Sequence, residues 1–371
     1  ISWVHLQKMD TSNFIMYKEE KMFGTYKEND VKILLTNISG KVKPFDTEER
    51  EQRIQTGVHY SEMLPIEHEP SPTYMEIYQY ALHRHSKMTA RAVAVVAEQI
   101  WREKGAKVVL VSLARAGTSI GVLIKRYIAF RHHVEVPHYT ISILRGRGID
   151  QNAMDYILTR HMPEDIQFVD GWTGKGAIQH ELNQAMKQYK NVDAGLAVLS
   201  DPAHIANKYG TQEDFLIASS CLNATVSGLL SRTFYRKDMI GEKQFHGAIF
   251  YRNLLEQDVT YEFIHAVEQY FATVETDNMP MRAVSKTAKQ EVEKICADFD
   301  IHDINLVKPS IGETTRVLLR RVPWKILVHR LDDEAHLGQI YQLAKEKGVP
   351  MIEYPLENYK ACGLIQKIAD N

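Results

Sequence analysis

Short apolar runs alternate with amphipathic stretches through the middle of the chain. Residues 107–112 and 139–143 are apolar runs of strand length, and a third run ends at residue 169. After the first run, apolar side chains recur with the spacing of one helix face, at Ile120, Leu123, Ile124 and Tyr127. Continuous apolar strands that alternate with helices are typical of a parallel sheet covered by helices. We therefore predict an α/β core over residues 106–278.

The N-terminal third of the chain has a mixed pattern. We expect a short apolar strand at residues 31–38 and a charged helix at residues 47–55. Ser71 and Pro72 form an N-cap and first-turn pair, and apolar positions continue as far as Trp101, so a long helix is expected here. Residues 1–105 are thus predicted to form a mixed, largely helical extension that covers the sheet.

Expected strands and helices alternate again in the last part of the chain. The expected elements are a polar helix from residue 285, strands at residues 325–329 and 349–354, and helices at residues 337–348 and from residue 360. Such alternation over so short a stretch indicates one compact unit. We predict a small α/β/α domain at residues 285–371.

Polar residues suited to a ligand follow the third apolar run. Asp170 ends the run, and a hydroxyl, a cation and small residues come next, at Thr173, Gly174, Lys175, Gly176 and Ala177. A strand-to-helix turn of small residues can bind an anion, because the first amides of a helix have no partner inside the helix. The alternative is an ordinary turn whose glycines serve only the backbone geometry.

Two further loops have similar chemistry. Small residues surround one cation after residues 107–112, in the order Ala114, Arg115, Ala116, Gly117 and Thr118. Arg145 and Arg147 follow residues 139–143 in a glycine-containing loop. Loops at the carboxyl ends of adjacent parallel strands converge on one crevice, and arginine suits phosphate oxygens. The three loops therefore predict one pocket for a sugar that carries a phosphate and a pyrophosphate.

This set of loops resembles the type I phosphoribosyltransferases. The resemblance implies a type I phosphoribosyltransferase-like parallel sheet, with ribose and its 5-phosphate held by Asp170 and residues 173–177. It places pyrophosphate at residues 114–118 and a flexible hood at residues 145–150, and it makes Asp170, Arg145 and Arg147 the expected catalytic residues. It also implies a phosphoribosyl pyrophosphate or nucleotide-type substrate that brings its own Mg²⁺. The second acidic position of the motif is Gly171, so one carboxylate would hold the ribose.

A closer resemblance extends over about residues 20–275. Residues 59–63, 112–121, 142–150, 169–175 and 222–228 are similar to one bacterial and phage family of phosphoribosyltransferase-like proteins from tellurite-resistance and stress gene neighbourhoods. That family is also labelled cysteine protease StiP. The resemblance implies a role in a stress-response pathway, and its two labels imply different chemistry.

The cysteine protease label makes Cys221 a candidate nucleophile. A thiol nucleophile needs a histidine or a helix N-terminus that lowers its pKa, and His59, His204 and His246 are the candidate partners. The alternative is that Cys221 is a small buried side chain, which is the usual place of a free cysteine. A third possibility is a module that senses a nucleotide and binds RNA without catalysis.

The C-terminal unit resembles the Pelota and ribosomal L7Ae type of RNA-binding domain. In that family a Gly-x-x-Glu loop before a basic helix binds a bent RNA. The resemblance implies contact with RNA or a ribonucleoprotein through Lys308, Gly312, Glu313, Thr314 and Arg316. The charged residues from 303 to 371 are nearly balanced in sign, so a broad basic face is not expected. The alternative is a domain that docks onto another protein.

Composition narrows the class of protein. The chain has 371 residues, a formal net charge of −2 and three cysteines. No apolar run approaches the roughly 20 residues that span a bilayer, and residues 1–30 do not have the order of a signal peptide. We expect a cytoplasmic protein with no membrane contact. His83 and His85, two residues apart, cannot share a helix face, so no protein-held metal is expected. The sequence leaves the oligomeric state open.

Overall fold

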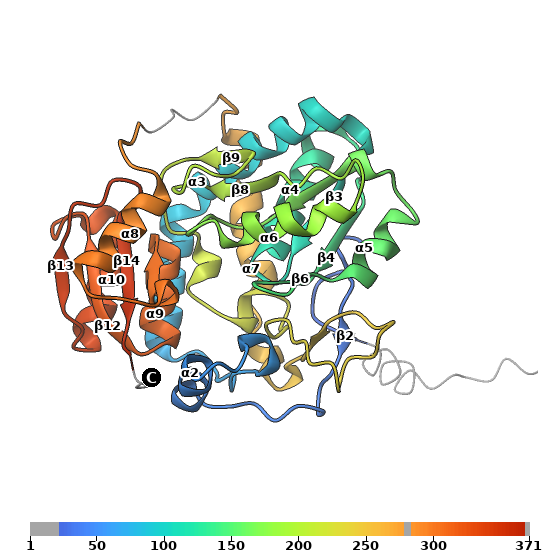
Figure 1. Ribbon diagram of the computed structural model, residues 1–371. Helices are drawn as coiled ribbons and strands as arrows, with labels where there is room; N and C mark the ends of the chain where they lie inside the picture. Colours follow the sequence, from blue (N-terminus) through green and yellow to red (C-terminus); the bar gives the residue numbers. More distant parts are fainter. Residues whose placement is uncertain (1–21, 278–282, 368–371) are drawn as a thin grey trace, which may run out of the picture.

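The core of the protein is a six-stranded parallel sheet (Figure 1). The computed structural model describes residues 22–277 and 283–367. The ends of the predicted outer domains, and most of residues 1–30, therefore lie outside the described residues. In the order of the sheet the strands are β1 (Lys32–Ile33), β4 (His138–Ile141), β3 (Val109–Leu113), β7 (Ile166–Val169), β8 (Leu196–Ser200) and β9 (Lys208–Thr211).

Alternate side chains of each strand enter two different apolar layers. In β3, Leu110 packs into the layer that holds α3 (Pro72–Lys104), α4 (Ala116–His132) and α7 (Thr260–Glu268). Its neighbours Val109 and Val111 pack against α5 (Gln151–Leu158) and α6 (Ala177–Ala185). This period of two follows from the pleat of the strand. The predicted α/β core with a parallel sheet and flanking helices is confirmed.

The N-terminal third contributes to the core sheet. The expected strand at residues 31–38 is two short strands, β1 at the sheet edge and β2 (Thr36–Asn37), which pairs with β10 (Gly247–Ala248). Helix α2 spans Thr47–Gln55 and begins at Asp46, whose side chain accepts the Glu49 amide. Helix α3 begins at Ser71 with Pro72 in its first turn, as the sequence predicts.

Short elements connect these parts. The hairpin of β5 (Ile143–Leu144) and β6 (Gly148–Ile149) occupies the predicted hood. The 3-10 helices are η1 (Tyr60–Glu62), η2 (Gly105–Lys107), η3 (Pro163–Asp165), η4 (Met186–Gln188), η5 (Ala218–Ser220), η6 (Ala224–Val226), η7 (Arg252–Gln257), η8 (Phe271–Thr273) and η9 (Ile304–Leu306).

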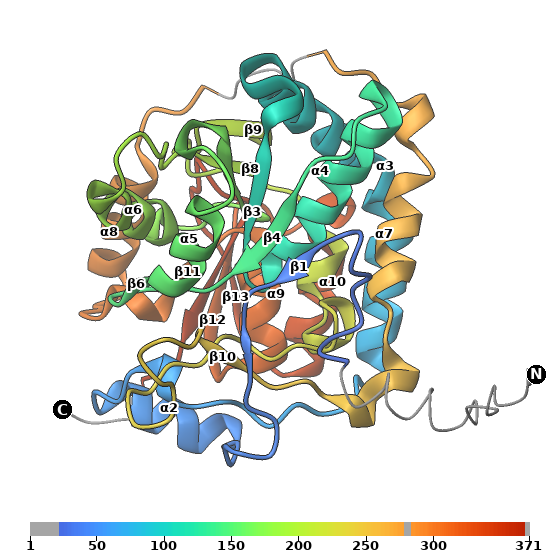
Figure 2. The same cartoon turned by 90° about the vertical axis from the view of Figure 1, so that its right-hand side faces the viewer.

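The C-terminal domain is a four-stranded sheet with helices against it, as Figure 2 shows from the side. Its strands run in the order β11 (Val307–Pro309), β14 (Ala361–Ile365), β12 (Pro323–Val328) and β13 (Met351–Glu353). Its helices are α8 (Ala288–Asp298), α9 (Ile311–Arg320) and α10 (Glu334–Glu346). The predicted small α/β domain is confirmed.

One predicted element of this domain is wrong. The helix expected from residue 360 is strand β14, which pairs with both β11 and β12. All five residues of β14 are buried, and a side chain at Gly363 would lie 3.0 Å from Cβ of Val317 in α9. A short apolar run has the same local pattern in a buried strand and in a buried helix, so its partners decide between them.

The two domains dock through specific polar contacts. The carboxylate of Asp214, from the core, accepts the amide of Ile311 at 3.0 Å and that of Lys360 at 2.9 Å. Ile311 is the first residue of α9, so the carboxylate also lies at the positive end of that helix. The Tyr359 hydroxyl donates to the Gly174 carbonyl at 2.7 Å. Apolar side chains of α9 and α10 continue the layer formed by α3 and α4.

Candidate functional site

A pocket of about 510 Å³ lies where the carboxyl ends of β3 and β7 face the C-terminal domain. Its wall includes the loops after both strands, the start of the hood, part of α2, residues 221–233 and one face of α9. Its volume is in the range of pockets that bind small molecules and cofactors. Asp170 and Lys175, which the sequence places on one loop, both line it.

The loop after β7 is fixed by hydrogen bonds to its neighbours. The Thr173 hydroxyl donates to Asp201 at 2.7 Å and accepts the Ala203 amide at 3.2 Å, and Thr173 is only 4% exposed. This hydroxyl, expected at the 5-phosphate, braces the loop, and Thr173 is also part of the pocket wall. The Lys175 ammonium donates to the Ile304 carbonyl of the C-terminal domain. Gly176, with φ of +86°, is the N-cap of α6, and Ala177 is its first residue.

Burial shifts the pKa values of both charged residues of this loop. Desolvation raises the pKa of the Asp170 carboxyl to about 6, although the Gly171 amide donates to it at 2.8 Å. Desolvation, and then repulsion from Arg145, lowers the pKa of Lys175 to about 8. Desolvation in the pocket thus disfavours the charged forms of both residues, and a ligand of opposite charge would stabilise them.

The loop after β3 presents Ala114, Arg115 and Ala116 to the pocket. The Arg115 guanidinium donates to Asn223 Oδ1 at 2.5 Å and to the Leu230 carbonyl at 3.0 Å. Gly117 and Thr118 are buried beneath this surface. A Cβ at Gly117 would lie 2.5 Å from the Val169 carbonyl oxygen, so glycine allows the two loops to approach each other. Thr118 shares a hydrogen bond with Thr140.

The two arginines of the hood lie in different places. Arg145 lines the pocket, with its guanidinium 5.3 Å from the centre of the Tyr60 ring. Arg147 is exposed, forms an ion pair with Glu62 and donates to the Tyr235 carbonyl at 3.1 Å. Of the expected catalytic residues, Asp170 and Arg145 therefore meet at one pocket, whereas Arg147 is engaged outside it.

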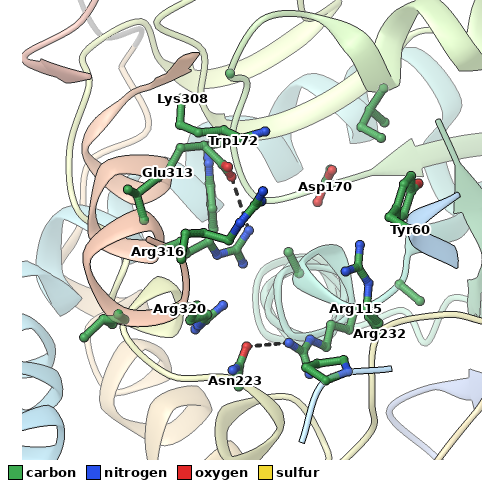
Figure 3. Close-up of a pocket in the computed structure, with 18 of the residues that line it drawn as sticks. Tyr60, Arg115, Asp170, Trp172, Asn223, Arg232, Lys308, Glu313, Arg316 and Arg320 are labelled. Carbon is green, nitrogen blue, oxygen red and sulfur yellow. Dashed lines mark hydrogen bonds and ion pairs between the residues drawn. The ribbon is translucent and has the colours of Figure 1, made fainter. Parts of the chain in front are cut away.

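Cations outnumber carboxylates by more than two to one in the pocket wall. Figure 3 shows side chains from both domains that converge on the cavity. The cations are Arg50, Arg115, Arg145, Lys175, Arg232, Lys308, Arg316, Arg320 and Arg321, and the carboxylates are Glu67, Glu69, Asp170 and Glu313.

Several of these cations are not among the candidates that the sequence provides. Arg50 lies on α2, whose charged sequence favours a solvated helix, yet Arg50 is only 6% exposed. Arg232 stacks over the Tyr60 ring at 4.6 Å. Arg320 is the last residue of α9, and Arg321 is its C-cap. No local motif marks these positions, because the tertiary fold brings them together; the spacing of four between Arg316 and Arg320 is the one signal that the sequence carries.

Four cations of the pocket wall have lowered pKa values. Burial, with repulsion from neighbouring guanidinium groups, lowers the pKa of Arg232 to about 9 and that of Arg50 to about 10. The same two causes hold the pKa of Lys308 and that of Arg320 well below their usual ranges. The pocket therefore holds more positive charge than its own carboxylates balance.

The residues expected to contact RNA lie against the core. Lys308, Glu313 and Arg316 line the pocket, and Thr314 has no exposed surface. A Cβ at Gly312 would lie 3.0 Å from the Trp172 ring, and the Arg316 guanidinium lies 4.4 Å from the centre of that ring. In this arrangement of the domains the five residues do not form an open RNA-binding surface.

Cys221 lies in the pocket wall but is 1% exposed. Desolvation raises the pKa of its thiol to about 12, against the opposing effect of Arg320. Two of the expected histidine partners bond elsewhere: His59 to Ser61 and the Arg145 carbonyl, and His246 to Ser142. Cys296 is half-buried and Cys362 is buried.

The part of the chain that the structure describes has neither a cluster of metal ligands nor a helix suited to a bilayer. Within residues 22–277 and 283–367, no group of three or more His, Cys, Asp or Glu side chains is arranged to hold a metal ion. Over the same ranges, no helix is both long enough and apolar enough to cross a bilayer.

The chain belongs to the family described as "Tellurite-like stress resistance cysteine protease StiP", which matches residues 24–268. Residues 286–367 match the family described as "PELOTA RNA binding domain". A relative from Acinetobacter baylyi (strain ATCC 33305 / BD413 / ADP1), named "Cysteine protease StiP", is 34% identical over 368 residues, which cover 93% of this chain and 94% of the relative. The family resemblance expected from the sequence is confirmed for both parts of the chain.

Solved structures similar to part of the chain include two phosphoribosyltransferases. A hypoxanthine-guanine phosphoribosyltransferase from Bacillus anthracis has a TM-score of 0.25 at 16% identity and covers 34% of this chain and 76% of its own. A xanthine-guanine-hypoxanthine phosphoribosyltransferase from Helicobacter pylori has a TM-score of 0.21 at 15% identity, with 30% and 70% covered.

Proposed function

We propose that the pocket between the two domains is the substrate site of an enzyme and that its substrate carries phosphate groups. The observation that carries this proposal is the excess of buried and half-buried cations over carboxylates in the pocket wall. Buried like charges are unfavourable unless a counter-charge joins them, and planar guanidinium groups match phosphate oxygens in shape. A sugar phosphate or a nucleotide supplies that charge and fits the volume.

Each loop has a part in this proposal. Asp170 would accept hydrogen bonds from sugar hydroxyls, and Lys175 with the amides of residues 174–177 would bind one phosphate. Arg115 and Arg145 would bind further phosphate oxygens. Mg²⁺ would arrive with the substrate, because it takes one or two carboxylates together with phosphate oxygens, and Asp170 is the carboxylate placed for that.

We propose a site for a phosphorylated substrate and do not assign phosphoribosyl transfer to it. The family description and the relative's name both refer to a cysteine protease, and neither refers to a transferase. The expected transferase activity and the phosphoribosyl substrate therefore remain proposals for experiment, in a protein of a stress-resistance family.

Calorimetric titration tests the anion site. Phosphoribosyl pyrophosphate and inorganic pyrophosphate, each with Mg²⁺, are titrated into the whole chain. Arg115→Gln and Lys175→Gln should each weaken binding about 10-fold or more, because each removes one charge-assisted contact. Arg236→Gln is the matched control, since Arg236 is exposed and pairs with Asp238 on the surface. Absence of binding to the unaltered protein would refute the proposal. Release of pyrophosphate from phosphoribosyl pyrophosphate would add a cleavage step to it, with water as the acceptor.

A second candidate is peptide hydrolysis with Cys221 as the nucleophile. The family description favours it, and Cys221 does lie in the pocket wall. Its thiol would have to lose its proton against a pKa of about 12, with Arg320 as a nearby cation that favours the thiolate. Cleavage of labelled casein should then be lost in Cys221→Ala and retained in Cys296→Ala. Equal turnover by the two variants would exclude Cys221.

A further inference from the structure

Helix α9 turns one charged face toward the pocket. Glu313, Arg316 and Arg320 are spaced by three and four residues, so they share a face of the helix. In Figure 3 the three side chains project from α9 toward the cavity, across from Asp170 and Arg115. Lys308, from β11, extends the same wall. These groups belong to the C-terminal domain, whereas the loops of the proposed substrate site belong to the core.

The cations of this face have little compensation within the protein. Glu313 is the carboxylate that pairs with Arg316, at 3.3 Å, and the buried Arg316 Nε has no hydrogen-bond partner. Arg320 donates to the carbonyl oxygens of Ser220 and Leu222, which are neutral groups. Buried donors without partners are unfavourable, so this face is better suited to a bound anion than to an unoccupied cavity.

Further cations face this wall from the core. Arg115 repels both Arg316 and Arg320, because all three side chains carry a positive charge. On the other side of Asp170, Lys308 is repelled by Arg145 and Lys175 in the same way. Positive groups from two domains thus repel each other at two places in the pocket wall, around Lys308 and around Arg320. A ligand with two anionic groups, one at each place, would remove both repulsions.

We propose that α9 and β11 supply the second half of the substrate site, so that a sugar or nucleoside phosphorylated at two separate positions bridges the two domains. This inference rests on the proposed function and adds direct ligand contacts by Arg316, Arg320 and Lys308. The face of the C-terminal domain that the Pelota resemblance assigns to RNA then serves, in this protein, to bind a small phosphorylated molecule.

Two probes, one with a single anionic group and one with two, test the core half and the C-terminal half of the site separately. Ribose 5-phosphate carries one anionic group, and phosphoribosyl pyrophosphate carries one at each end of the same sugar. Both are titrated into the whole chain and into Arg316→Gln and Arg320→Gln. Arg330→Gln is the matched control, because Arg330 lies on the same domain, is largely exposed and pairs with Asp332. A circular dichroism spectrum and a melting curve check that each variant is folded.

The unaltered chain should bind phosphoribosyl pyrophosphate at least 10-fold more tightly than ribose 5-phosphate. Arg316→Gln and Arg320→Gln should each weaken the two-anion probe about 10-fold or more, and the control should not. The conservative variant Arg316→Lys, which keeps the charge, should recover part of the loss; should Arg316→Gln fail to fold, Arg316→Lys and Arg320→Gln decide the result.

Failure of the proposed function and failure of the bridging ligand give different results. If neither probe binds the unaltered chain, the proposed function itself is wrong. If both probes bind, and Lys175→Gln weakens them while the α9 variants bind like the control, the phosphate site stands and the role of the C-terminal domain is refuted. Equal affinity of the unaltered chain for the two probes would also overturn the bridging ligand.

Discussion

Asp170 and Lys175 stand five residues apart on one loop, and burial brings their pKa values together. The carboxyl has a pKa of about 6 and the ammonium a pKa of about 8, so both are ionised between these values. A rise in pH therefore weakens the binding of an anionic ligand at both residues. Protonation of Asp170 below pH 6 removes a repulsion, and deprotonation of Lys175 above pH 8 removes an attraction.

Anion affinity should therefore fall as the pH rises through about 8, where free Lys175 loses its proton. Titration with sulfate is the measurement, because sulfate keeps the same charge between pH 6 and pH 10. The variant Lys175→Met should bind sulfate more weakly, and its affinity should change less over this range. An unaltered chain whose affinity is constant from pH 7 to pH 9.5 would contradict the prediction.

Replacement of Asp170 by Asn should stabilise the fold at neutral pH. The pKa of Asp170 is raised from 3.8 to about 6, so the folded state disfavours the ionised carboxylate. The unaltered chain should lose stability relative to Asp170→Asn as the pH rises from 4 to 7, by roughly 2 kcal/mol, because each unit of pKa shift is worth about 1.4 kcal/mol. Urea unfolding at pH 4.5 and pH 7.5 measures the difference in stability between the two proteins. If that difference were the same at both pH values, the buried carboxylate would not be its cause.

At the residue scale, the sequence predicts the part of the site that lies on strand-to-helix loops. Asp170, Lys175 and Arg115 follow apolar strands, and the parallel sheet brings such loops together. Arg50 and Arg232 could not be predicted, since an arginine on a charged helix or in an irregular loop has no local feature that marks it as part of a pocket wall. The sequence predicts that Thr173 meets phosphate; Thr173 lines the pocket, and its hydroxyl donates to Asp201.

At the scale of elements, the close packing of two loops depends on one glycine. Gly117, in the first turn of α4, faces the end of β7 so closely that a Cβ would lie 2.5 Å from a backbone oxygen. Backbone cannot move aside as a flexible side chain can, so a methyl group at this position must push α4 away from the Asp170 loop.

Gly117→Ala should therefore lower the free energy of unfolding by about 1 to 3 kcal/mol, the usual effect of overpacking. It should also weaken anion binding, because Arg115 moves relative to Lys175. Gly241→Ala is the control, since a Cβ there is exposed and meets its nearest neighbour, the Gln244 side chain, at 3.5 Å. Urea unfolding of both variants measures the effect, and equal stability would show that the loops separate without strain.

The sequence pattern predicts the start of helix α3 correctly and the last strand, β14, wrongly. The cap of helix α3 predicts its start correctly, because Ser71 and Pro72 act locally. The sequence pattern predicts a helix in place of strand β14, because five apolar residues carry no periodicity that separates the two states. The strand is decided by β11 and β12, which pair with it from distant parts of the sequence.

At the scale of the whole molecule, the two domains form one site. The sequence predicts both domains but not their contact, because the contact depends on single polar groups such as Asp214 and Tyr359. Asp214 holds the start of α9 and also the backbone before β14, so it fixes the wall that carries Arg316 and Arg320.

Asp214→Asn should loosen this contact. An amide keeps the size of the side chain but has one acceptor oxygen in place of two and no negative charge at the helix start. We expect a loss of about 1 to 3 kcal/mol in unfolding free energy, and weaker binding of phosphoribosyl pyrophosphate with little change for ribose 5-phosphate. The exposed Asp238→Asn is the control. A variant as stable as the control would show that α9 is held by its apolar contacts alone.

One aromatic ring lies at the junction of these parts. Trp172, on the core loop after Asp170, packs against Gly312 and beneath the guanidinium of Arg316. An indole is a natural fluorophore, and its emission responds to a change in the charge above its ring. The protein thus has a built-in optical reporter: occupancy of the cavity can be followed by fluorescence in the unlabelled chain. Trp172→Phe separates the response of this ring from the emission of the other three tryptophans.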